Sequence, residues 1–223
     1  MASVSSTPST GQATGQVTRP ATSGEPLRGY AKGRLRREEI LDTARALFGE
    51  VGYRSASLRE IAARCGISHP GLLHHFPTKE ALLEAVLQRR DAVSEERFGV
   101  IRARGTEALR ALVEIVAANV AEPGEVELYC VLSAESTAPD HPAHQYFTDR
   151  YVTTRANLER SLREAAEDGD LRAGVDPSVH APIVVAVMDG LQVQWLLDRD
   201  SPAPTDMPAA LRAHLNTLLT HPL

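Results

Sequence analysis

Apolar residues recur at intervals of three and four along most of this chain from residue 37 onward. The first such stripe, over residues 37–51, predicts a helix that ends at Gly52. No segment keeps the alternation of a strand, so the pattern predicts an all-α fold. The same spacing predicts further helices over residues 78–93, 94–102, 106–119, 126–137, 142–168, 177–198 and 208–219.

Two short helices joined by a tight turn are predicted between residues 57 and 77. Ser57 is a good N-cap, and Glu60 three residues later completes a capping box. Gly66 supplies the positive φ that a turn between crossing helices requires. Ser68 then caps the second helix. These features are typical of a helix-turn-helix.

The segment 177–198 carries apolar residues around nearly its whole helical circumference. A helix of this kind must be buried on more than one side. The cover could come from the rest of the same chain. It could also come from a second copy, in a four-helix arrangement with two helices from each chain.

The net charge of −5 conceals an asymmetry along the 223 residues. Residues 1–104 hold 16 Lys and Arg against 11 Asp and Glu, whereas residues 105–223 hold 8 against 18. A basic part is attracted to a phosphate backbone, and an acidic part is repelled by it. We therefore expect any contact with nucleic acid to be made by the N-terminal part.

The N-terminal end is poor in large apolar residues, and residues 1–27 are expected to form a disordered tail. The basic residues that follow form either a solvated tail or an arm that adds phosphate or minor-groove contacts. The arm is favoured because these charges adjoin the helix-turn-helix. The basic residues are Arg28, Lys32, Arg34, Arg36 and Arg37.

Three features predict a cytoplasmic protein. Cys65 and Cys130 lie far apart, and Cys65 beside the turn glycine is interpreted as a small core residue, so no disulfide is expected. The first 25 residues are rich in Ser, Thr, Gly and Pro, unlike a signal peptide. The longest apolar run, residues 181–197, is too short and too polar to span a bilayer comfortably, so no membrane partner is expected.

Three motifs follow one another along the chain: AxxLFxExGY over residues 44–53, LREIAARCGIS over residues 58–68 and LLHHFPTKEALL over residues 72–83. Together they resemble the DNA-binding module of the TetR family of transcriptional regulators. The resemblance runs from Arg36 to Arg90, about a quarter of the chain. It implies a transcriptional regulator, expected to be a repressor, that binds a double-stranded DNA operator.

The resemblance also implies a domain organisation and partners. The disordered tail of residues 1–27 would precede a helix-turn-helix domain over 28–78 and a ligand-binding and dimerisation domain over 79–223. The protein would be a homodimer whose C-terminal domain binds a small-molecule effector, displaces the fourth helix and weakens affinity for a palindromic operator. No cofactor and no catalytic residue are assigned.

By analogy with the family, the second helix of the motif enters the major groove. The residues nearest to base edges would be His69, Gly71, Leu73 and His74. Phosphates would be bound by Ser57, Ser68, His75 and Lys79, with further backbone contacts from Arg36, Tyr53 and Arg59.

Two of these positions depart from the family pattern. Leu73 stands where most relatives have tyrosine, so one phosphate hydrogen bond is missing. Gly71 has no side chain with which to read a base. His69 and His74 would then carry more of the readout, with some pH sensitivity near the unperturbed histidine pKa of about 6.5.

The effector is not identified by the sequence. Polar and aromatic residues of the C-terminal domain could line its pocket, although each could instead be a core or interface residue. These candidates are Phe98, Tyr129, Glu135, Tyr151, Asp189 and Trp195.

Three other functions are alternatives to a regulator. An enzyme is disfavoured because no nucleophile elbow, glycine-rich phosphate loop or zinc spacing is present. A metal sensor would use His141 and His144 with the distant Cys130, but a fourth ligand is lacking. A helical dimerisation or adaptor protein without DNA specificity is suggested by Leu73 and Gly71, and opposed by Lys79 and the basic arm.

Overall fold

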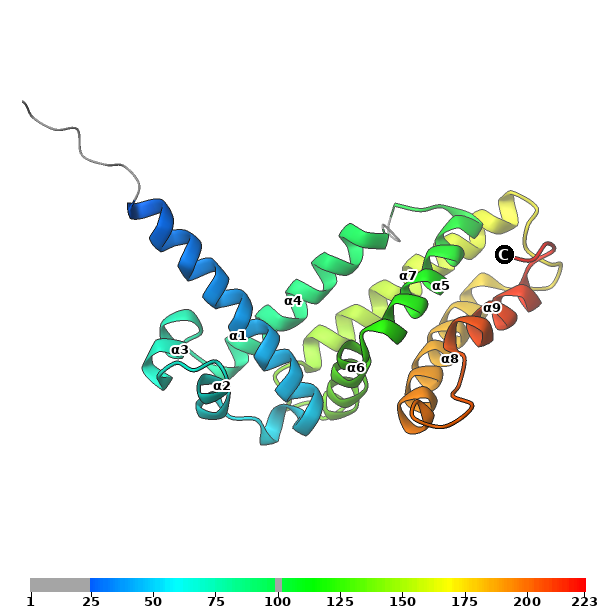
Figure 1. The fold of residues 1–223 in the computed structure, drawn as a ribbon. Coiled ribbons are helices and arrows are strands. Elements are labelled where there is room, and N and C mark those ends of the chain that lie inside the picture. The colour runs from blue at the N-terminus through cyan, green and yellow to red at the C-terminus, as the bar shows by residue number, and fades with distance from the viewer. Residues whose placement is uncertain (1–24, 99–101) are drawn as a thin grey trace, which may run out of the picture. The chain divides into compact units, whose positions relative to one another are not determined.

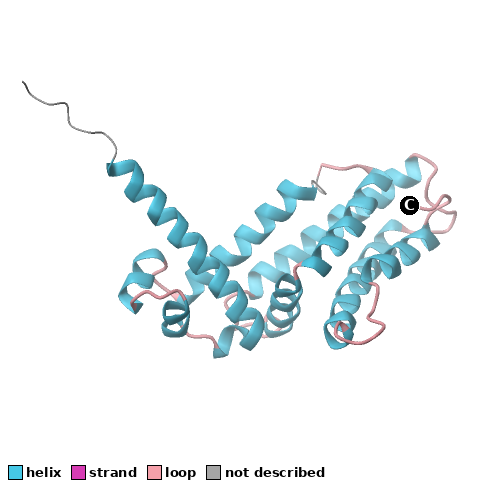
Figure 2. Cartoon of the chain, in the orientation of Figure 1, coloured by secondary structure: helices cyan, strands magenta, loops and turns pink. Residues whose placement is uncertain are grey.

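The computed structural model describes the backbone of residues 25–98 and 102–223. Over these ranges the chain forms nine helices, and its strand pairing is limited to one isolated bridge between Leu171 and Leu219 (Figure 2). The predicted all-α fold is confirmed. The helices are α1 Glu25–Ser55, α2 Leu58–Arg64, α3 His69–His75, α4 Lys79–Phe98, α5 Gly105–Ala121, α6 Pro123–Glu135, α7 His144–Glu167, α8 Pro177–Asp198 and α9 Met207–Leu218.

α1 begins at Glu25, well before the predicted start at residue 37. The apolar stripe that supported the prediction starts only at Ile40, so it could not mark the earlier turns. Those turns are formed largely by Arg, Lys, Leu and Ala, which favour helix without an apolar face, and Pro26 suits a first turn. Residues 25–27 are therefore helical, and the rest of the expected disordered tail lies outside the described residues.

Two other helix boundaries differ from the prediction. The segment 94–102 does not start a new helix, because α4 continues through Ser94 to Phe98 without a glycine or proline to end it. α6 begins at Pro123, three residues before the predicted start at residue 126, because the missing N–H of a proline costs nothing in the first turn of a helix. Ser94 can either begin a helix or continue one, and Pro123 can either precede a helix or stand in its first turn.

Residues 36–223 form one compact unit with two apolar cores. The first core lies among the helices α1, α2, α3 and α4 and includes the buried side chains of Phe48, Ile61 and Leu72. Leu128 and Leu132 of α6 pack into it as well. The packing is therefore continuous across residue 78, where the sequence placed the boundary between the DNA-binding and ligand-binding domains.

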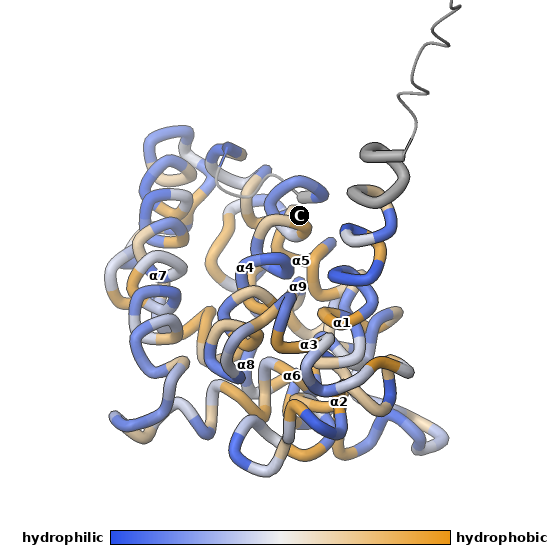
Figure 3. Tube along the Cα trace, turned by 90° about the vertical axis from the view of Figure 1, so that its left-hand side faces the viewer, coloured by the Kyte–Doolittle hydropathy of each residue, from blue (hydrophilic) through white to orange (hydrophobic). Residues whose placement is uncertain are grey.

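The second core lies among α5, α7, α8 and α9, which run side by side (Figure 1). Leu109, Leu162, Val184 and Leu211 are fully buried in it. α7 is hydrophilic along much of its length (Figure 3), so only one of its faces contributes to this core. Burial of these apolar surfaces stabilises the helical domain by about 25 cal/mol per Å².

α8 is only partly covered by its own chain. Ala181, Val184, Val185 and Trp195 are buried, whereas a second stripe on the same helix remains exposed. The whole of α8 is long and apolar enough to cross a membrane, although the run of residues 181–197 within it is not. Core helices of soluble proteins commonly have the same length and composition, so this is weak evidence for a membrane span. The exposed stripe consists of Val179, Ile183, Val193 and Leu197.

Candidate nucleic-acid interface and internal cavity

The turn between α2 and α3 is built from two capping serines and a glycine. Ser57 Oγ accepts the N–H of Glu60 at 3.2 Å, and Ser68 Oγ accepts the N–H of Gly71 at 3.1 Å. Gly66 has a φ of 63°, the left-handed conformation that ends α2. The helix-turn-helix predicted from these residues is confirmed.

α3 buries Leu72 completely and leaves much of its remaining surface accessible. Among the residues predicted to face bases, His74 is exposed, while His69, Gly71 and Leu73 are half-exposed. The half-burial of Leu73 leaves part of an apolar side chain available at this surface. An apolar atom at such a position can contact a thymine methyl group, as a hydroxyl cannot.

His75 lies at the basic end of α3. Its ring centroid is 5.7 Å from that of His74. Burial lowers the pKa of His75, and the nearby positive charges of His74, Arg36 and Arg37 lower it further. The end of α3 and Arg36 and Arg37 of α1 therefore bring basic side chains close together.

Lys79 serves as an internal cap. Its Nζ donates hydrogen bonds to the carbonyl oxygens of Tyr53 and Ala56, both at 2.8 Å, and of Arg54 at 3.3 Å. It also lies 4.3 Å from the centroid of the Tyr53 ring. The ammonium group therefore neutralises the carbonyl end of α1 and joins it to the first turn of α4.

Tyr53 is buried beside this cap. Its hydroxyl donates to Glu80 Oε1 at 2.8 Å, and burial together with this carboxylate raises the pKa of Tyr53. Because its hydroxyl is engaged in this bond, Tyr53 positions α4 against α1. Both Lys79 and Tyr53, predicted as DNA contacts, are thus placed where they hold the module together.

The remaining predicted contacts lie at the surface. Ser57, Arg59 and Ser68 are exposed. Arg36 is half-exposed and donates to Glu39 Oε2 at 2.8 Å and to the carbonyl oxygen of Cys65 at 3.1 Å. The bond to Cys65 holds Arg36 next to the turn between α2 and α3.

A cavity of about 460 Å³ opens among α4, α5, α6, α7 and α8. Three of the six predicted pocket residues, Tyr129, Tyr151 and Asp189, line it. Leu112 and Met188 contribute to an apolar wall, and other lining residues are polar. A partly apolar cavity with a few polar groups is the usual character of a small-molecule site.

Asp91 of α4 is the centre of the polar side. Its Oδ2 accepts the hydroxyl of Tyr146 at 2.7 Å, and its Oδ1 accepts Arg150 Nη1 at 2.7 Å and the Tyr129 hydroxyl at 3.2 Å. The guanidinium carbons of Arg90 and Arg150 lie 3.7 and 4.7 Å from the centroid of the Tyr129 ring. These bonds and cation–π contacts connect α4 to α6 and α7.

Three predicted pocket residues are not seen at the cavity. Glu135 lies at the end of α6, where its Oε2 accepts the backbone N–H of Tyr53 at 2.7 Å. Trp195 is buried in the second core, with the Arg199 guanidinium 5.9 Å from its ring. Phe98 ends α4, and its side chain lies outside the described residues.

Sequence reasoning missed Asp91, Tyr146 and Arg150. Tyr146 and Arg150 are four residues apart on α7, so helical spacing places them on one face and could have linked the two. Asp91 had no comparable signal, because its role depends on contacts with residues 38 to 59 positions away.

The three residues weighed as a metal site do not converge. His141 Nδ1 accepts the N–H of Ala143 at 3.2 Å, and His144 Nδ1 bonds to the carbonyl oxygen of Ser136 at 2.8 Å. Cys130 instead faces Gln192 of α8. In the described part of the chain, no three His, Cys, Asp or Glu side chains are grouped as a metal site requires.

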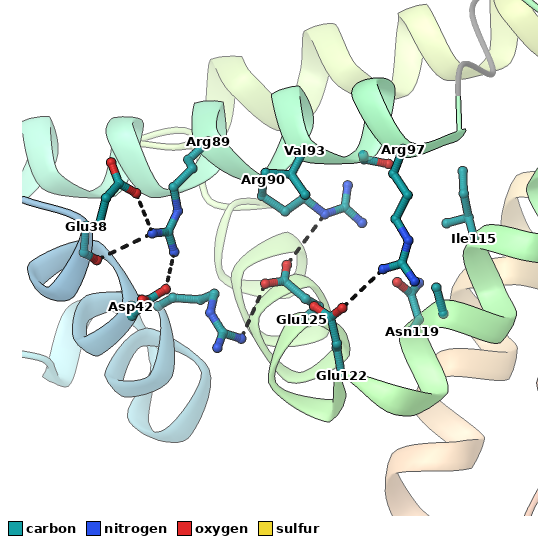
Figure 4. A pocket seen from close by; sticks show the side chains of 13 residues that line it. Glu38, Asp42, Arg89, Arg90, Val93, Arg97, Ile115, Asn119, Glu122 and Glu125 are labelled. Atoms are coloured by element: carbon teal, nitrogen blue, oxygen red, sulfur yellow. Dashed lines mark hydrogen bonds and ion pairs between the residues drawn. The ribbon is translucent and has the colours of Figure 1, made fainter. Parts of the chain in front are cut away.

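A second cavity, of about 330 Å³, lies among α1, α4, α5 and α6 (Figure 4). On one side, Arg89 of α4 donates to Glu38 Oε2 at 3.0 Å and to Asp42 Oδ1 at 2.6 Å, both on α1. On the other, Arg90 Nε lies 3.7 Å from Glu125 Oε2 of α6. Arg90 and Ser94 of α4 and two residues of α5 line both cavities, so the two adjoin each other.

Two sequence matches identify the family. Residues 40–86 match the bacterial regulatory proteins described as the tetR family, and residues 105–220 match the C-terminal part of BetI-type transcriptional repressors. The second match alone covers more than half of the chain. The chain belongs to the tetR family. This regulator is accordingly a helix-turn-helix DNA-binding protein of the repressor type.

Related proteins match most of the length of the regulator. It is 25% identical to the transcriptional regulator UidR of Escherichia coli K12 over 82% of this chain and 93% of UidR. It is 31% identical to the repressor AcnR of Corynebacterium efficiens over 69% of this chain and 78% of AcnR. These relatives are transcriptional regulators, not enzymes.

Solved structures show the same fold. Salmonella enterica GusR is 27% identical with a TM-score of 0.64, over 89% of this chain and 99% of GusR. A Saccharomonospora viridis transcriptional regulator in complex with choline is 22% identical with a TM-score of 0.70, over 84% of this chain and all of that one.

Proposed function

We propose that the regulator binds a palindromic operator as a homodimer and leaves it when a small molecule fills the cavity of about 460 Å³. The observation that carries this proposal is the position of α4. Its first residue, Lys79, caps α1 of the DNA-binding module, and about three turns later Arg90 and Asp91 line the cavity. A ligand that moves α4 therefore acts on both sites at once.

In this proposal α3 lies in the major groove. His69, Gly71, Leu73 and His74 lie nearest to the base edges, with Leu73 offering an apolar contact to thymine in place of a hydrogen bond. Phosphates are bound by the exposed or half-exposed side chains and by the first N–H groups of α4. Those side chains are Arg36, Ser57, Arg59, Ser68 and His75.

Lys79 and Tyr53 have an indirect role in the same proposal. Their polar groups are engaged within the protein, so they keep the start of α4 and the end of α1 in register. The N–H groups at the start of α4 can then face a phosphate. In this assignment Lys79 and Tyr53 are both needed for operator binding, although neither side chain contacts the DNA.

The homodimer is supported by the exposed stripe on α8. Val179, Ile183 and Val193 are each more than 40% exposed, and Leu197 is 83% exposed. An apolar stripe of this kind on a helix already packed on its other side is typical of a subunit interface. Two copies related by a twofold axis would read two half-sites about one helical turn apart, at a cytoplasmic location.

The small-molecule effector is supported by the character of the cavity. A volume of about 460 Å³ falls in the ordinary range for ligand sites, and the Asp91 network in its wall joins three helices. The Saccharomonospora viridis neighbour, solved with choline, shows that a protein of this fold can hold a small molecule.

Selection of fragments from sheared source-genome DNA tests the proposal. We expect an inverted repeat to be recovered and to bind at least about a thousandfold more tightly than random DNA at physiological salt. Weak, sequence-indifferent and steeply salt-dependent binding would instead show that the basic N-terminal arm acts alone. The adaptor function suggested by Gly71 and Leu73 would then replace the proposal.

Variants of α3 separate base reading from phosphate binding. His69→Ala and Leu73→Ala should weaken operator binding by about 1–3 kcal/mol and relax preference at single base pairs. Arg59→Ala should weaken binding equally for all sequences and reduce the salt slope by about one. Unchanged base preference in both α3 variants would contradict the assigned orientation of α3.

A further inference from the structure

One partly buried carboxylate of the cavity has no positive side chain paired with it among the described residues. Asp189 of α8 lines the cavity, and its Oδ2 accepts the hydroxyl of Tyr151 at 2.8 Å. Over the ranges that the structure describes, no lysine, arginine or histidine forms an ion pair with it. Burial raises the pKa of Asp189, with the Tyr151 bond and the more distant charge of Arg150 acting in the opposite direction.

The two arginines that line the cavity are already engaged. Arg150 pairs with Asp91 at 2.7 Å, and the aromatic face of Tyr129 covers its guanidinium group. Arg90 lies over the same ring and lies 3.7 Å from Glu125. Nearby carboxylates therefore neutralise both arginines of the wall, and neither arginine neutralises the negative charge of Asp189.

Besides Asp91, which pairs with Arg150, two further carboxylates of the wall differ from Asp189. Asp149 is exposed and accepts the Gln145 amide at 2.8 Å, so water screens it at the rim. Glu95 lies 3.9 Å from Arg102. Asp189 is the more desolvated of the three, and a desolvated carboxylate gains most from an added positive charge.

The surroundings of Asp189 set the shape of its partner. Val185 and Met188 precede it on α8, and Leu112 of α5 and Leu158 of α7 line the same cavity. These four side chains form an apolar wall with room for a hydrocarbon body. A ligand that fits both features has an apolar part and a charged end.

We infer that the effector of this regulator is an organic cation whose positively charged nitrogen pairs with Asp189 while its apolar body lies against Leu112, Leu158, Val185 and Met188. The inference rests on the proposed function, which makes this cavity the effector site. An anionic effector would face an unbalanced carboxylate with no free arginine to offset it. In this inference the cavity selects its ligands by the positive charge at one end of the molecule more than by the size of the molecule.

Calorimetry with three probes of equal length tests the charge preference: 4-phenylbutylamine, 4-phenyl-1-butanol and 4-phenylbutyrate, which are positive, neutral and negative at pH 7. On the full chain, the amine should bind about tenfold or more tightly than the alcohol, and the butyrate most weakly. Asp189→Asn, which keeps an acceptor for Tyr151, should remove the preference and leave alcohol binding unchanged. Asp149→Asn is the matched control and should retain it.

A second measurement does not depend on probe affinity. A thiol introduced by Met188→Cys is treated with a trimethylammonium or a sulfonate methanethiosulfonate, and peptide mass spectrometry follows residue 188 alone. Relative to a free thiol, the cationic reagent should react about tenfold faster than the anionic one, and Asp189→Asn should abolish the difference. Equal rates, or a faster anionic reagent, would overturn the inference even if none of the three probes binds.

Operator release distinguishes this inference from the proposed function. If the amine binds through Asp189 but leaves the operator complex intact, the effector site lies elsewhere and the charge preference stands. If an anionic compound releases the operator through this cavity, the cation inference is wrong and the proposed function stands. Release by the amine that is lost in Asp189→Asn supports both.

Discussion

The carboxylate of Glu135 accepts the backbone N–H of Tyr53 at 2.7 Å, across 82 residues of sequence. His141 Nε2 lies 3.6 Å from the same carboxylate, and the His141 ring meets the Tyr53 ring edge-on with centroids 5.1 Å apart. The bond falls beside Gly52, whose φ of 77° kinks α1. α6, which lines the larger cavity through Tyr129, is thereby bonded to the end of α1, and Arg45 Nη1 of α1 lies 3.3 Å from Glu125 Oε1 at the start of α6.

Removing this contact should destabilise the protein. Glu135→Ala leaves the Tyr53 N–H without its acceptor, at an expected cost of about 1–3 kcal/mol in the free energy of unfolding. Glu135→Gln keeps an acceptor and should cost less. Urea denaturation measures both, with Glu114→Ala, an exposed glutamate of α5, as control. A loss in Glu135→Ala no larger than in the control would show that water replaces the carboxylate.

The buried His141 should make stability depend on pH. Burial lowers the pKa of its imidazole, outweighing Glu135 and Asp140, which raise it; Arg54 lowers it further. The unfolded chain therefore takes up this proton at higher pH than the folded chain, and stability should fall as the pH drops below about 6.5. Burial also lowers the pKa of His75 and His214, so both contribute in the same direction.

Thermal unfolding between pH 8 and pH 5 checks this expectation. In His141→Asn, which keeps an acceptor for the Ala143 N–H, the loss of stability on acidification should be smaller than in the unmodified protein. Part of the slope should remain because His75 and His214 still titrate. An unchanged slope would assign the whole pH dependence to groups other than His141.

Replacing Lys79 should lower the stability of the fold and leave the salt dependence of operator binding unchanged. Lys79→Met removes three hydrogen bonds to carbonyl oxygens, and unfolding should become easier by about 1.5–3 kcal/mol. The salt slope of operator binding should stay the same, because no phosphate contact is lost. A slope reduced by about one would instead show that Lys79 binds a phosphate, as the sequence resemblance implies.

The cap of α3 should affect both folding and binding. Ser68→Ala removes the acceptor of the Gly71 N–H, at an expected cost of about 1 kcal/mol in unfolding free energy. Operator affinity should fall as well, since α3 has only seven residues and frays easily. Ser201→Ala, in the loop after α8, is the control. Equal effects of the two changes would contradict the capping role.

The exposed stripe of α8 should govern oligomeric state. Ile183→Asp places a charge in the proposed interface and should shift the protein towards monomer in sedimentation velocity, with operator affinity falling in parallel. Val152→Asp makes the same change on α7, outside the α8 stripe, where Val152 is 54% exposed, and should leave the dimer intact. Equal effects would mean that the stripe does not form the interface.

The sequence was sufficient where structure depends on neighbouring residues. Ser57, Gly66 and Ser68 specify the helix-turn-helix through caps and a turn that each involve three or four consecutive positions. The helix 177–198 has the predicted bounds because Asp176 caps it and Pro177 follows in its first turn. Local chemistry of this kind is the same in any fold.

The sequence was insufficient where a side chain has to choose among distant partners. Glu135 and Asp189 are both acidic residues on helices of the same domain, and nothing in their neighbourhoods shows that one bonds to the DNA-binding module and the other lines the cavity. Arg150 looks like a surface residue of a polar helix until folding brings Asp91 beside it. Such assignments depend on packing between helices, which the apolar pattern predicts only in outline.

The uncovered stripe on α8 also bears on gene dosage. If two chains must meet before either can read a two-part operator, the number of competent pairs in dilute conditions rises with the square of expression. Halving the amount of chain then leaves about a quarter of the pairs. Regulated genes would therefore escape control sharply once expression of the regulator drops below the level at which pairs form.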